Sequence, residues 1–238
     1  MRFKKLFGDK KAIIGMIHLS GVTRAQKIKR ALLEIEIYQQ CGLSGCIVEN
    51  YHGTTADVVE ALEEIDMNVD NSFKVGINIL PNDFELALDL ADEYGDFIQI
   101  DHIAGEYEHG KPIGPSDMKA KERFPNVVIL GGVWPKYYTP IQTSSLKTDV
   151  LVGMGRSDAL VVSGQGTGKE TPLPKIKTFR KFIGERYPLI VGAGVDQWNI
   201  AEQMEYADGA IVGSCFKLGK MTHTPVHKQR VVELMERL

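Results

Sequence analysis

The sequence predicts an α/β protein that consists of a single (β/α)8 TIM barrel. Three observations lead to this prediction: eight short runs rich in Val and Ile recur along the chain, segments with helical spacing separate them, and 238 residues suit one such barrel. An open, doubly wound sheet would also alternate strands with helices, but eight consecutive units without a GxGxxG motif after the first strand favour the closed barrel. We therefore expect one domain over residues 1–238.

The predicted strands are nearly continuous apolar runs. Strands that lie between a barrel interior and an outer layer of helices have no wet face, so they lack the alternation of a half-exposed sheet. In chain order, the predicted strands cover residues 12–19, 45–50, 75–80, 97–102, 127–133, 159–164, 189–195 and 209–216.

Helices are predicted between these strands from the spacing of apolar residues. In the first helix, an i, i+3, i+4, i+7 stripe from Ile28 to Tyr38 would face the barrel. Asp83 and Asp196 suit helix starts, because a short side-chain oxygen can accept from free backbone N–H groups. The predicted helices cover residues 25–41, 55–69, 83–94, 174–186 and 226–238, with weaker signals at 117–123 and 144–154 and a long loop at 135–140.

The composition excludes several classes of protein. A net charge of -3 with scattered Lys and Arg offers no basic surface for nucleic acid. No apolar run has the roughly 18 residues of a membrane span, and the N-terminus lacks the apolar core of a secretion signal. Cys41, Cys46 and Cys215 are odd in number without CxxC spacing, which indicates small buried thiols rather than disulfides or a zinc site. We expect a cytoplasmic protein with no nucleic-acid partner and no integral membrane segment. A homo-oligomer is expected only on general grounds, because homo-oligomers are common among soluble proteins.

Glycine-rich segments after the last three strands predict a phosphate site. Glycine lets the backbone approach a ligand closely, and exposed N–H groups beside a helix start attract oxyanions. In many barrels the loops after strands seven and eight form such a pocket. Tight turns and a mobile loop after strand six are the plain alternatives. The predicted phosphate-binding residues are Gly164, Gly166, Thr167, Gly168, Gly192, Gly194, Gly213 and Ser214.

Polar residues at the ends of the first four strands predict a reaction side on the same face of the barrel. Carboxylates and imidazoles that converge there can transfer protons beside a carbonyl or a sugar hydroxyl. With the neighbouring asparagines they could instead hold a divalent metal, although no metal-specific spacing is present. For each residue, a hydrogen-bonded role at the barrel rim is the alternative. The predicted catalytic residues are His18, Glu49, Asp101 and His102, and the predicted substrate-binding residues are Asn50, Asn78 and Lys136.

Lys136 follows the fifth predicted strand, in the loop bounded by Pro135 and Pro140. We expect it first as a partner for a phosphate or carboxylate group. A Schiff-base amine is the alternative, and it requires a desolvated site that favours the neutral amine.

Several segments make the chain similar to the BtpA/SgcQ family. They read Ile-Gly-Met-Ile-His-Leu at residues 14–19, Ile-Val-Glu-Asn at 47–50 and Val-Gly-Ala-Gly-Val at 191–195, with further matches at 75–83, 158–168 and 207–217. The resemblance spans nearly the whole chain and implies a barrel of the ribulose-phosphate-binding type. Family members are associated with photosystem I biogenesis or with sugar-utilisation gene clusters. The chain departs from the family pattern after residue 21, where a helix follows directly, and at residues 98–102, Ile-Gln-Ile-Asp-His.

The leading hypothesis is an enzyme that binds a phosphosugar or another phosphorylated metabolite and acts as an isomerase, epimerase or lyase. The alternative is a non-catalytic assembly or regulatory factor, which the resemblance to photosystem I biogenesis proteins implies. Fold by itself does not decide between them, because function depends on the site. The sequence leaves open the substrate and any cofactor, including a divalent metal.

Overall fold

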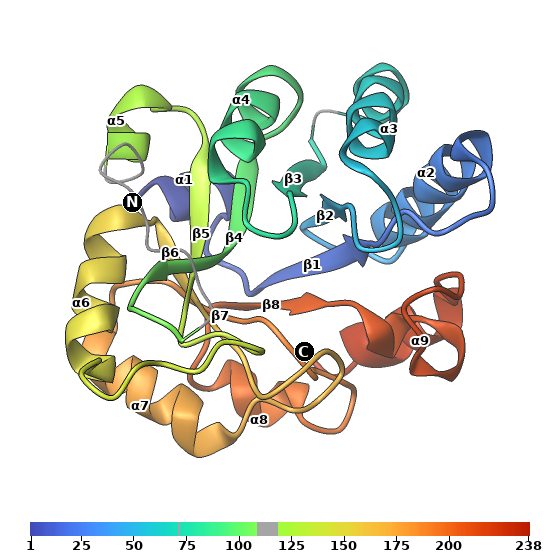
Figure 1. Ribbon diagram of the computed structural model, residues 1–238. Helices are drawn as coiled ribbons and strands as arrows, with labels where there is room; N and C mark the ends of the chain where they lie inside the picture. Colours follow the sequence, from blue (N-terminus) through green and yellow to red (C-terminus); the bar gives the residue numbers. More distant parts are fainter. Residues whose placement is uncertain (71, 109–118) are drawn as a thin grey trace.

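Eight parallel strands close into a barrel in the computed structural model, which describes residues 1–70, 72–108 and 119–238. Each strand pairs with the next one along the chain, and the last pairs with the first (Figure 1). This closed order confirms the predicted barrel and excludes the open sheet. The strands are β1 (Ala12–Ile17), β2 (Gly45–Glu49), β3 (Lys74–Asn78), β4 (Phe97–Ala104), β5 (Val128–Val133), β6 (Ala159–Val162), β7 (Leu189–Val191) and β8 (Gly209–Val212).

The strands are apolar throughout because they serve two hydrophobic cores. Alternate residues such as Ile14, Ile47, Leu130 and Ile190 point inward and fill the barrel. The residues between them point outward and pack under the helices in a larger core. Side chains on successive strand residues point to opposite faces, so a strand buried on both sides needs apolar residues at every position.

Helices follow the strands and cover the outside of the barrel (Figure 1). Asp83 accepts a hydrogen bond from the Leu86 N–H and starts its helix as predicted. Asp196 accepts from the Trp198 N–H in a turn instead, so the next helix begins four residues later, at Ile200. The helices are α2 (Arg24–Gln40), α3 (Thr55–Asn68), α4 (Phe84–Tyr94), α5 (Ala120–Arg123), α6 (Leu146–Arg156), α7 (Leu173–Ile183), α8 (Ile200–Met204) and α9 (Lys228–Met235), with 3-10 turns η2 (Ser214–Phe216) and η3 (Leu218–Lys220).

An additional N-terminal helix, α1 (Arg2–Phe7), closes the end of the barrel where the strands begin. The Phe3 side chain joins the inner core, and the Phe7 ring meets the edge of Phe97 at a centroid distance of 5.4 Å. The Arg2 guanidinium donates to the backbone carbonyl oxygen of Phe124 at 2.9 Å. This basic, apolar segment is therefore part of the barrel. Among the helices of the described chain, none combines the length and apolar character needed to cross a bilayer.

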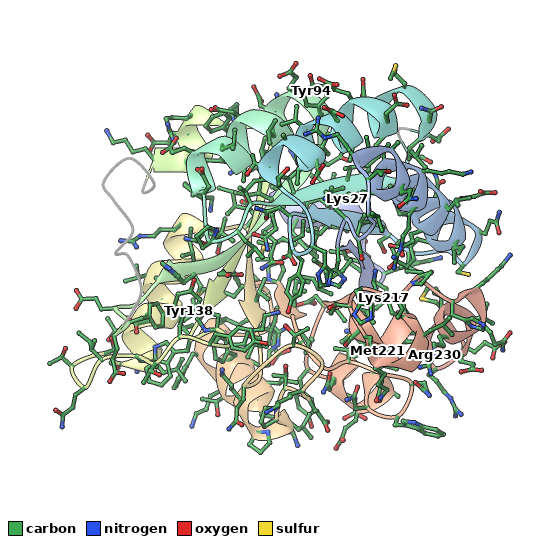
Figure 2. All side chains as sticks on the ribbon, turned by 45° about the vertical axis from the view of Figure 1, so that its right-hand side comes forward. Lys27, Tyr94, Tyr138, Lys217, Met221 and Arg230 are labelled. Atoms are coloured by element: carbon green, nitrogen blue, oxygen red, sulfur yellow. The ribbon has the colours of Figure 1, made fainter. Side chains whose placement is uncertain are left out.

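A buried ion pair joins the first and last parts of the chain. Lys217, which follows η2, is 1% exposed, and its Nζ lies 3.3 Å from Glu34 on α2 (Figure 2). The same carboxylate accepts from Arg30 at 2.9 Å and from the Val226 N–H at 3.1 Å. Removing one partner would leave a buried charge, which is costly, so this cluster holds the segment after β8 against α2.

Candidate functional site

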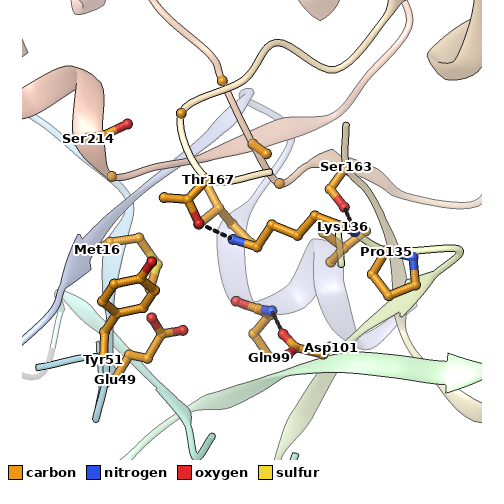
Figure 3. A pocket seen from close by; sticks show the side chains of 18 of the residues that line it. Met16, Glu49, Tyr51, Gln99, Asp101, Pro135, Lys136, Ser163, Thr167 and Ser214 are labelled. Atoms are coloured by element: carbon orange, nitrogen blue, oxygen red, sulfur yellow. Dashed lines mark hydrogen bonds between the residues drawn. The ribbon is translucent and has the colours of Figure 1, made fainter. Parts of the chain in front are cut away.

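A cavity of about 220 Å³ lies at the carboxyl ends of the strands (Figure 3). Its apolar floor is the top of the inner core, formed by Met16, Val161 and Ile211. Titratable side chains from β1, β2, β4 and the loop after β5 form one side, which we call the titratable wall. The backbone after β6, β7 and β8 forms the other side, the glycine wall. The predicted residues that line the cavity are His18, Glu49, Asp101, Lys136, Thr167, Gly168, Gly192, Gly194, Gly213 and Ser214.

Glu49 ends β2 and is 6% exposed. Its strand pairs with β3 so that Asn78 stands directly opposite, and the Asn78 amide donates to the Glu49 Oε2 at 2.6 Å. Burial raises the pKa of Glu49 to about 7. The positive charge of Lys136 opposes this rise, the nearby Asp101 adds to it, and the hydrogen bond from Asn78 opposes it. A carboxyl with a pKa near 7 can both accept and return a proton at neutral pH.

Asp101 approaches the cavity from β4, together with Gln99 two residues earlier. The Gln99 amide lies 3.5 Å from the Asp101 carboxylate, and the Asp101 backbone N–H donates to the Asn82 side chain at 2.9 Å. Burial raises the pKa of Asp101, and the positive charge of Lys136 opposes this rise. The cavity therefore contains two carboxyl groups with raised pKa values that share one lysine.

Lys136 extends across the cavity from the loop after β5 (Figure 3). Its backbone N–H donates to the Ser163 hydroxyl at 2.9 Å, and its Nζ lies 3.4 Å from the Thr167 hydroxyl. The amine of Lys175 on α7 supports this loop by donating to the carbonyl oxygens of Trp134 and Ser163 at 2.8 and 2.7 Å. Burial lowers the pKa of Lys175 to about 8. Its supporting role was not predicted, because α7 is remote from this loop in the sequence.

His18 is 3% exposed and lies where β1 reaches the cavity. Burial, followed by the nearby charge of Lys217, holds the pKa of His18 well below its usual value, so the imidazole is neutral at pH 7. Its Nδ1 has no hydrogen-bond partner among the described residues. The ring faces Tyr51 at a centroid distance of 5.2 Å. A neutral imidazole can orient a substrate hydroxyl or carbonyl group by hydrogen bonding.

Three predicted side chains lie outside the cavity lining. His102 is adjacent to Asp101 on the strand and points outward, where it packs against Tyr107 and Tyr138 at centroid distances of 5.2 and 4.9 Å. The Asn50 side chain holds the next loop by accepting from the Leu80 N–H at 2.7 Å and donating to its carbonyl oxygen. Asn78 lies behind Glu49. Consequently, the geometry does not support the predicted catalytic role of His102 or direct substrate contact by either asparagine.

The glycine wall is shaped by close approaches between backbone segments. Gly194 has a φ of 65°, and a Cβ there would collide with the backbone of Lys169 and Glu170. Gly164 is likewise close to the Glu170 carbonyl oxygen, and it lies outside the lining together with Gly166. A Cβ on Gly213 would stand 3.1 Å from the His18 ring. Packing therefore explains Gly164 and Gly194, whereas Gly213 faces the cavity beside His18.

Tyr137 and Gln99 also line the cavity, although they were not predicted. The Tyr137 hydroxyl accepts from the Thr167 N–H at 2.8 Å. Hydrogen bonding with Thr167, first through its side chain and then through this N–H, lowers the pKa of the phenol. Gln99 could have been found, because residues two apart on a strand share a face. Tyr137 could not, because it belongs to an irregular loop with a φ of 69°.

The described residues contain no cluster of metal-binding side chains and no disulfide. Within residues 1–70, 72–108 and 119–238, no group of three or more His, Cys, Asp and Glu side chains is placed to hold a metal ion. The three cysteines are free thiols. Cys46 and Cys215 are buried as predicted, whereas Cys41 is half-buried at the end of α2.

The fold and this cavity define a (β/α)8 barrel with a polar site at its carboxyl-end face. The chain matches the model of the BtpA family over residues 9–238 and belongs to that family. An uncharacterised protein of Pyrococcus abyssi is 27% identical, with 94% of each chain covered. The photosystem I biogenesis protein BtpA of Synechocystis is also 27% identical, over 86% of this chain and 80% of that protein.

Two solved structures show the same fold at low sequence identity. The 3-hexulose-6-phosphate synthase of Salmonella typhimurium superposes with a TM-score of 0.63 at 16% identity, covering 95% of this chain and 98% of that one. The N-(5'-phosphoribosyl)anthranilate isomerase of Pyrococcus furiosus gives a TM-score of 0.60 at 15% identity, with the same coverage. These likenesses establish the TIM-barrel architecture.

Proposed function

We propose that the protein is an isomerase, epimerase or lyase that acts on a phosphorylated small molecule in this cavity. One observation carries the proposal: Glu49, with a pKa of about 7, shares the cavity with Asp101 and Lys136 opposite the glycine wall. The phosphate would bind the backbone after β7 and β8, where many barrels of this architecture hold phosphate. The similar barrels support this choice of ligand, because both are named for phosphorylated compounds.

Proton transfer beside a carbonyl group is the chemistry that fits the titratable wall. The ionised form of Glu49 would remove a proton from the carbon next to the carbonyl, and the charge that develops on the carbonyl oxygen would face the Lys136 ammonium group. Asp101 would carry the second proton, and His18 would orient a hydroxyl group as a neutral hydrogen-bonding partner. The apolar floor, formed by Met16, Val161 and Ile211, lowers the local dielectric and would strengthen these interactions.

Ligand binding is the first test of this proposal. Inorganic phosphate and a series of sugar phosphates are titrated against the protein while the melting temperature is recorded. A ligand at about 100 times its Kd stabilises the folded state by about 2.7 kcal/mol. Gly213→Ala places a methyl group beside His18 and should weaken binding at least tenfold. If no phosphorylated compound raises the melting temperature, the proposed ligand class is wrong.

Proton exchange then tests the chemistry. A compound that binds is incubated with the protein in deuterium oxide, and loss of the proton next to its carbonyl group is followed by NMR. We expect exchange that falls at least a hundredfold in Glu49→Gln, because the amide cannot accept the proton. Exchange that persists in both Glu49→Gln and Asp101→Asn would contradict the assignment.

The non-catalytic alternative makes a different prediction. It is favoured by the 27% identity to a protein named for photosystem I biogenesis. An assembly factor would co-purify with a membrane complex and would retain that association in Glu49→Gln and Asp101→Asn. The apolar residues of α1, Phe3, Leu6 and Phe7, are packed into the barrel base, so they are not free to insert into a membrane.

A further inference from the structure

Lys136 supplies an amine to this cavity, and that amine has no close ion pair with any residue that the structure describes. Among the described lining residues, no other lysine side chain is present. The Nζ has the neutral Thr167 hydroxyl at 3.4 Å, and it forms no ion pair within 4.0 Å with a described residue. Lys217 differs, because it is 1% exposed and paired with Glu34 at 3.3 Å. The Lys136 amine is therefore available to a ligand.

The loop that carries Lys136 is anchored by hydrogen bonds at Trp134, two residues before the lysine. Trp134 adopts a φ of 50°, and its backbone N–H donates to the Tyr107 hydroxyl at 3.0 Å. Its carbonyl oxygen accepts from Lys175, and its indole N–H donates to Asp149 at 2.8 Å. An anchored loop presents its side chain to a substrate from a defined position, which favours covalent catalysis.

The charges around the cavity determine how a phosphorylated ligand would enter. Glu49 and Asp101 would repel a phosphate dianion, so the phosphate belongs at the part of the glycine wall that follows β7 and β8. The uncharged end of the ligand then lies beside the Lys136 amine and the two carboxyl groups. An amine next to two proton carriers can condense with a carbonyl group, because a neighbouring carboxylate can act as the base that removes the ammonium proton.

We propose that Lys136 forms an imine with a carbonyl carbon of the ligand, which makes the substrate a phosphorylated aldehyde or ketone. This inference rests on the proposed function, because the phosphate is what orients the carbonyl group. It replaces two charge roles of Lys136 with a covalent role: the role first expected, as a partner for phosphate, and the role proposed above, as an ammonium group that faces the carbonyl oxygen.

The covalent step needs only the groups present. Ionised Glu49 removes a proton from the ammonium group, and the nitrogen lone pair attacks the carbonyl carbon. The carbonyl oxygen takes up the proton that Glu49 carries, and the nitrogen, now positively charged, releases a proton to the Asp101 carboxylate, which leaves a neutral carbinolamine. Asp101 returns this proton to the hydroxyl group, which leaves as water while the nitrogen lone pair closes the C=N bond of a protonated imine. Amine plus carbonyl becomes imine plus water, without an oxidant or reductant. Burial of Glu49 and Asp101 raises the pKa of both carboxyl groups, so both can carry these protons.

Reductive trapping tests the imine directly. The full chain is incubated with dihydroxyacetone phosphate, and separately with glyceraldehyde 3-phosphate, in the presence of sodium cyanoborohydride. Reduction converts an imine into a stable secondary amine, so the intact mass should increase by the mass of the probe minus one oxygen atom. We expect one adduct per chain, mapped to Lys136 by peptide mass spectrometry and suppressed by excess inorganic phosphate.

Two variants separate a nucleophile from a simple positive charge. Lys136→Arg retains the charge but cannot form the imine under these conditions, so it should lose the adduct at least tenfold while binding inorganic phosphate within a few-fold of the parent. Lys147→Met removes an exposed lysine from α6 and should leave the adduct unchanged. An adduct that persists in Lys136→Arg would overturn the inference, as would probes that raise the melting temperature without forming one. If neither probe nor inorganic phosphate binds, the proposed function fails, and the imine fails with it.

Discussion

The two walls of the cavity are built by opposite means. The glycine wall depends on residues without side chains, which allow the loop after β6 to lie against the ends of β7 and β8. The titratable wall depends on side chains whose properties come from burial, as the raised pKa of Glu49 shows. A substitution should therefore damage the first wall through sterics and the second through charge. The comparison also shows that a glycine in a ligand-lining segment can be required by the protein's own packing.

Gly194→Ala should produce the largest effect. The new Cβ meets the Lys169 backbone while the residue keeps a left-handed φ of 65°, and we expect a loss of about 3 kcal/mol or more in the free energy of unfolding. Gly184→Ala is the control, because Gly184 has a φ of 71° with nothing within 4 Å of its Cβ position. It should cost about 1 kcal/mol. Urea denaturation measures both, and equal losses would show that close packing is not what Gly194 provides.

Glu49 should make stability fall as the pH rises. Its pKa is raised from 4.5 to about 7 in the folded chain, so the unfolded chain releases this proton first, between pH 4.5 and 7. Below pH 4.5 the contribution of Glu49 to the free energy of unfolding is fully present. Above pH 7 about 3 kcal/mol of this free energy is lost. Glu49→Gln should remove this dependence and be the more stable protein at pH 8, despite losing proton transfer. Denaturation at pH 5 and pH 8 provides the comparison, with the exposed Glu185→Gln as control.

The hydrogen bond from Asn78 should lower the pKa of Glu49. Asn78 donates to the Glu49 carboxylate at 2.6 Å and thereby favours its charged form. Asn78→Ala should raise the pKa of Glu49 further, by about one unit, as followed by carboxyl carbon NMR. Asn50→Ala is the matched control, since the Asn50 side chain contacts Leu80 instead. A pKa that stays at its parent value in Asn78→Ala would mean that this hydrogen bond does not stabilise the carboxylate.

Tyr137→Phe should have the smallest effect. The variant removes the acceptor of the Thr167 N–H, and the side chain is 69% exposed, so the expected loss in unfolding free energy is about 0.5 kcal/mol. Amide hydrogen exchange at Thr167 should become faster, because its N–H is then bound to solvent. Unchanged exchange would show that other contacts hold the loop after β6.

The predicted strands and most helices follow from patterns that short stretches of chain determine. The apolar run 12–19 must be buried on both faces whatever its partners are, and the stripe from Ile28 to Tyr38 needs a surface to cover. Helix α1 was not predicted, because it packs against the open end of the inner core, and that surface exists only after the sheet has closed into a barrel. Residues 117 and 118 of the weak helical signal lie outside the described residues.

By itself, the sequence determined the barrel and the face on which its polar strand ends meet, because both follow from local periodicity and the parallel order of the strands. Only the tertiary structure decided which of two neighbours, Asp101 or His102, enters the cavity. Because side chains alternate between the two faces of a strand, one of these neighbours must point inward, and the register of the strands in the barrel decides which of the two does so. Likewise, the raised pKa of Glu49 and the support of Lys136 by Lys175 depend on burial and contacts between segments distant in the chain.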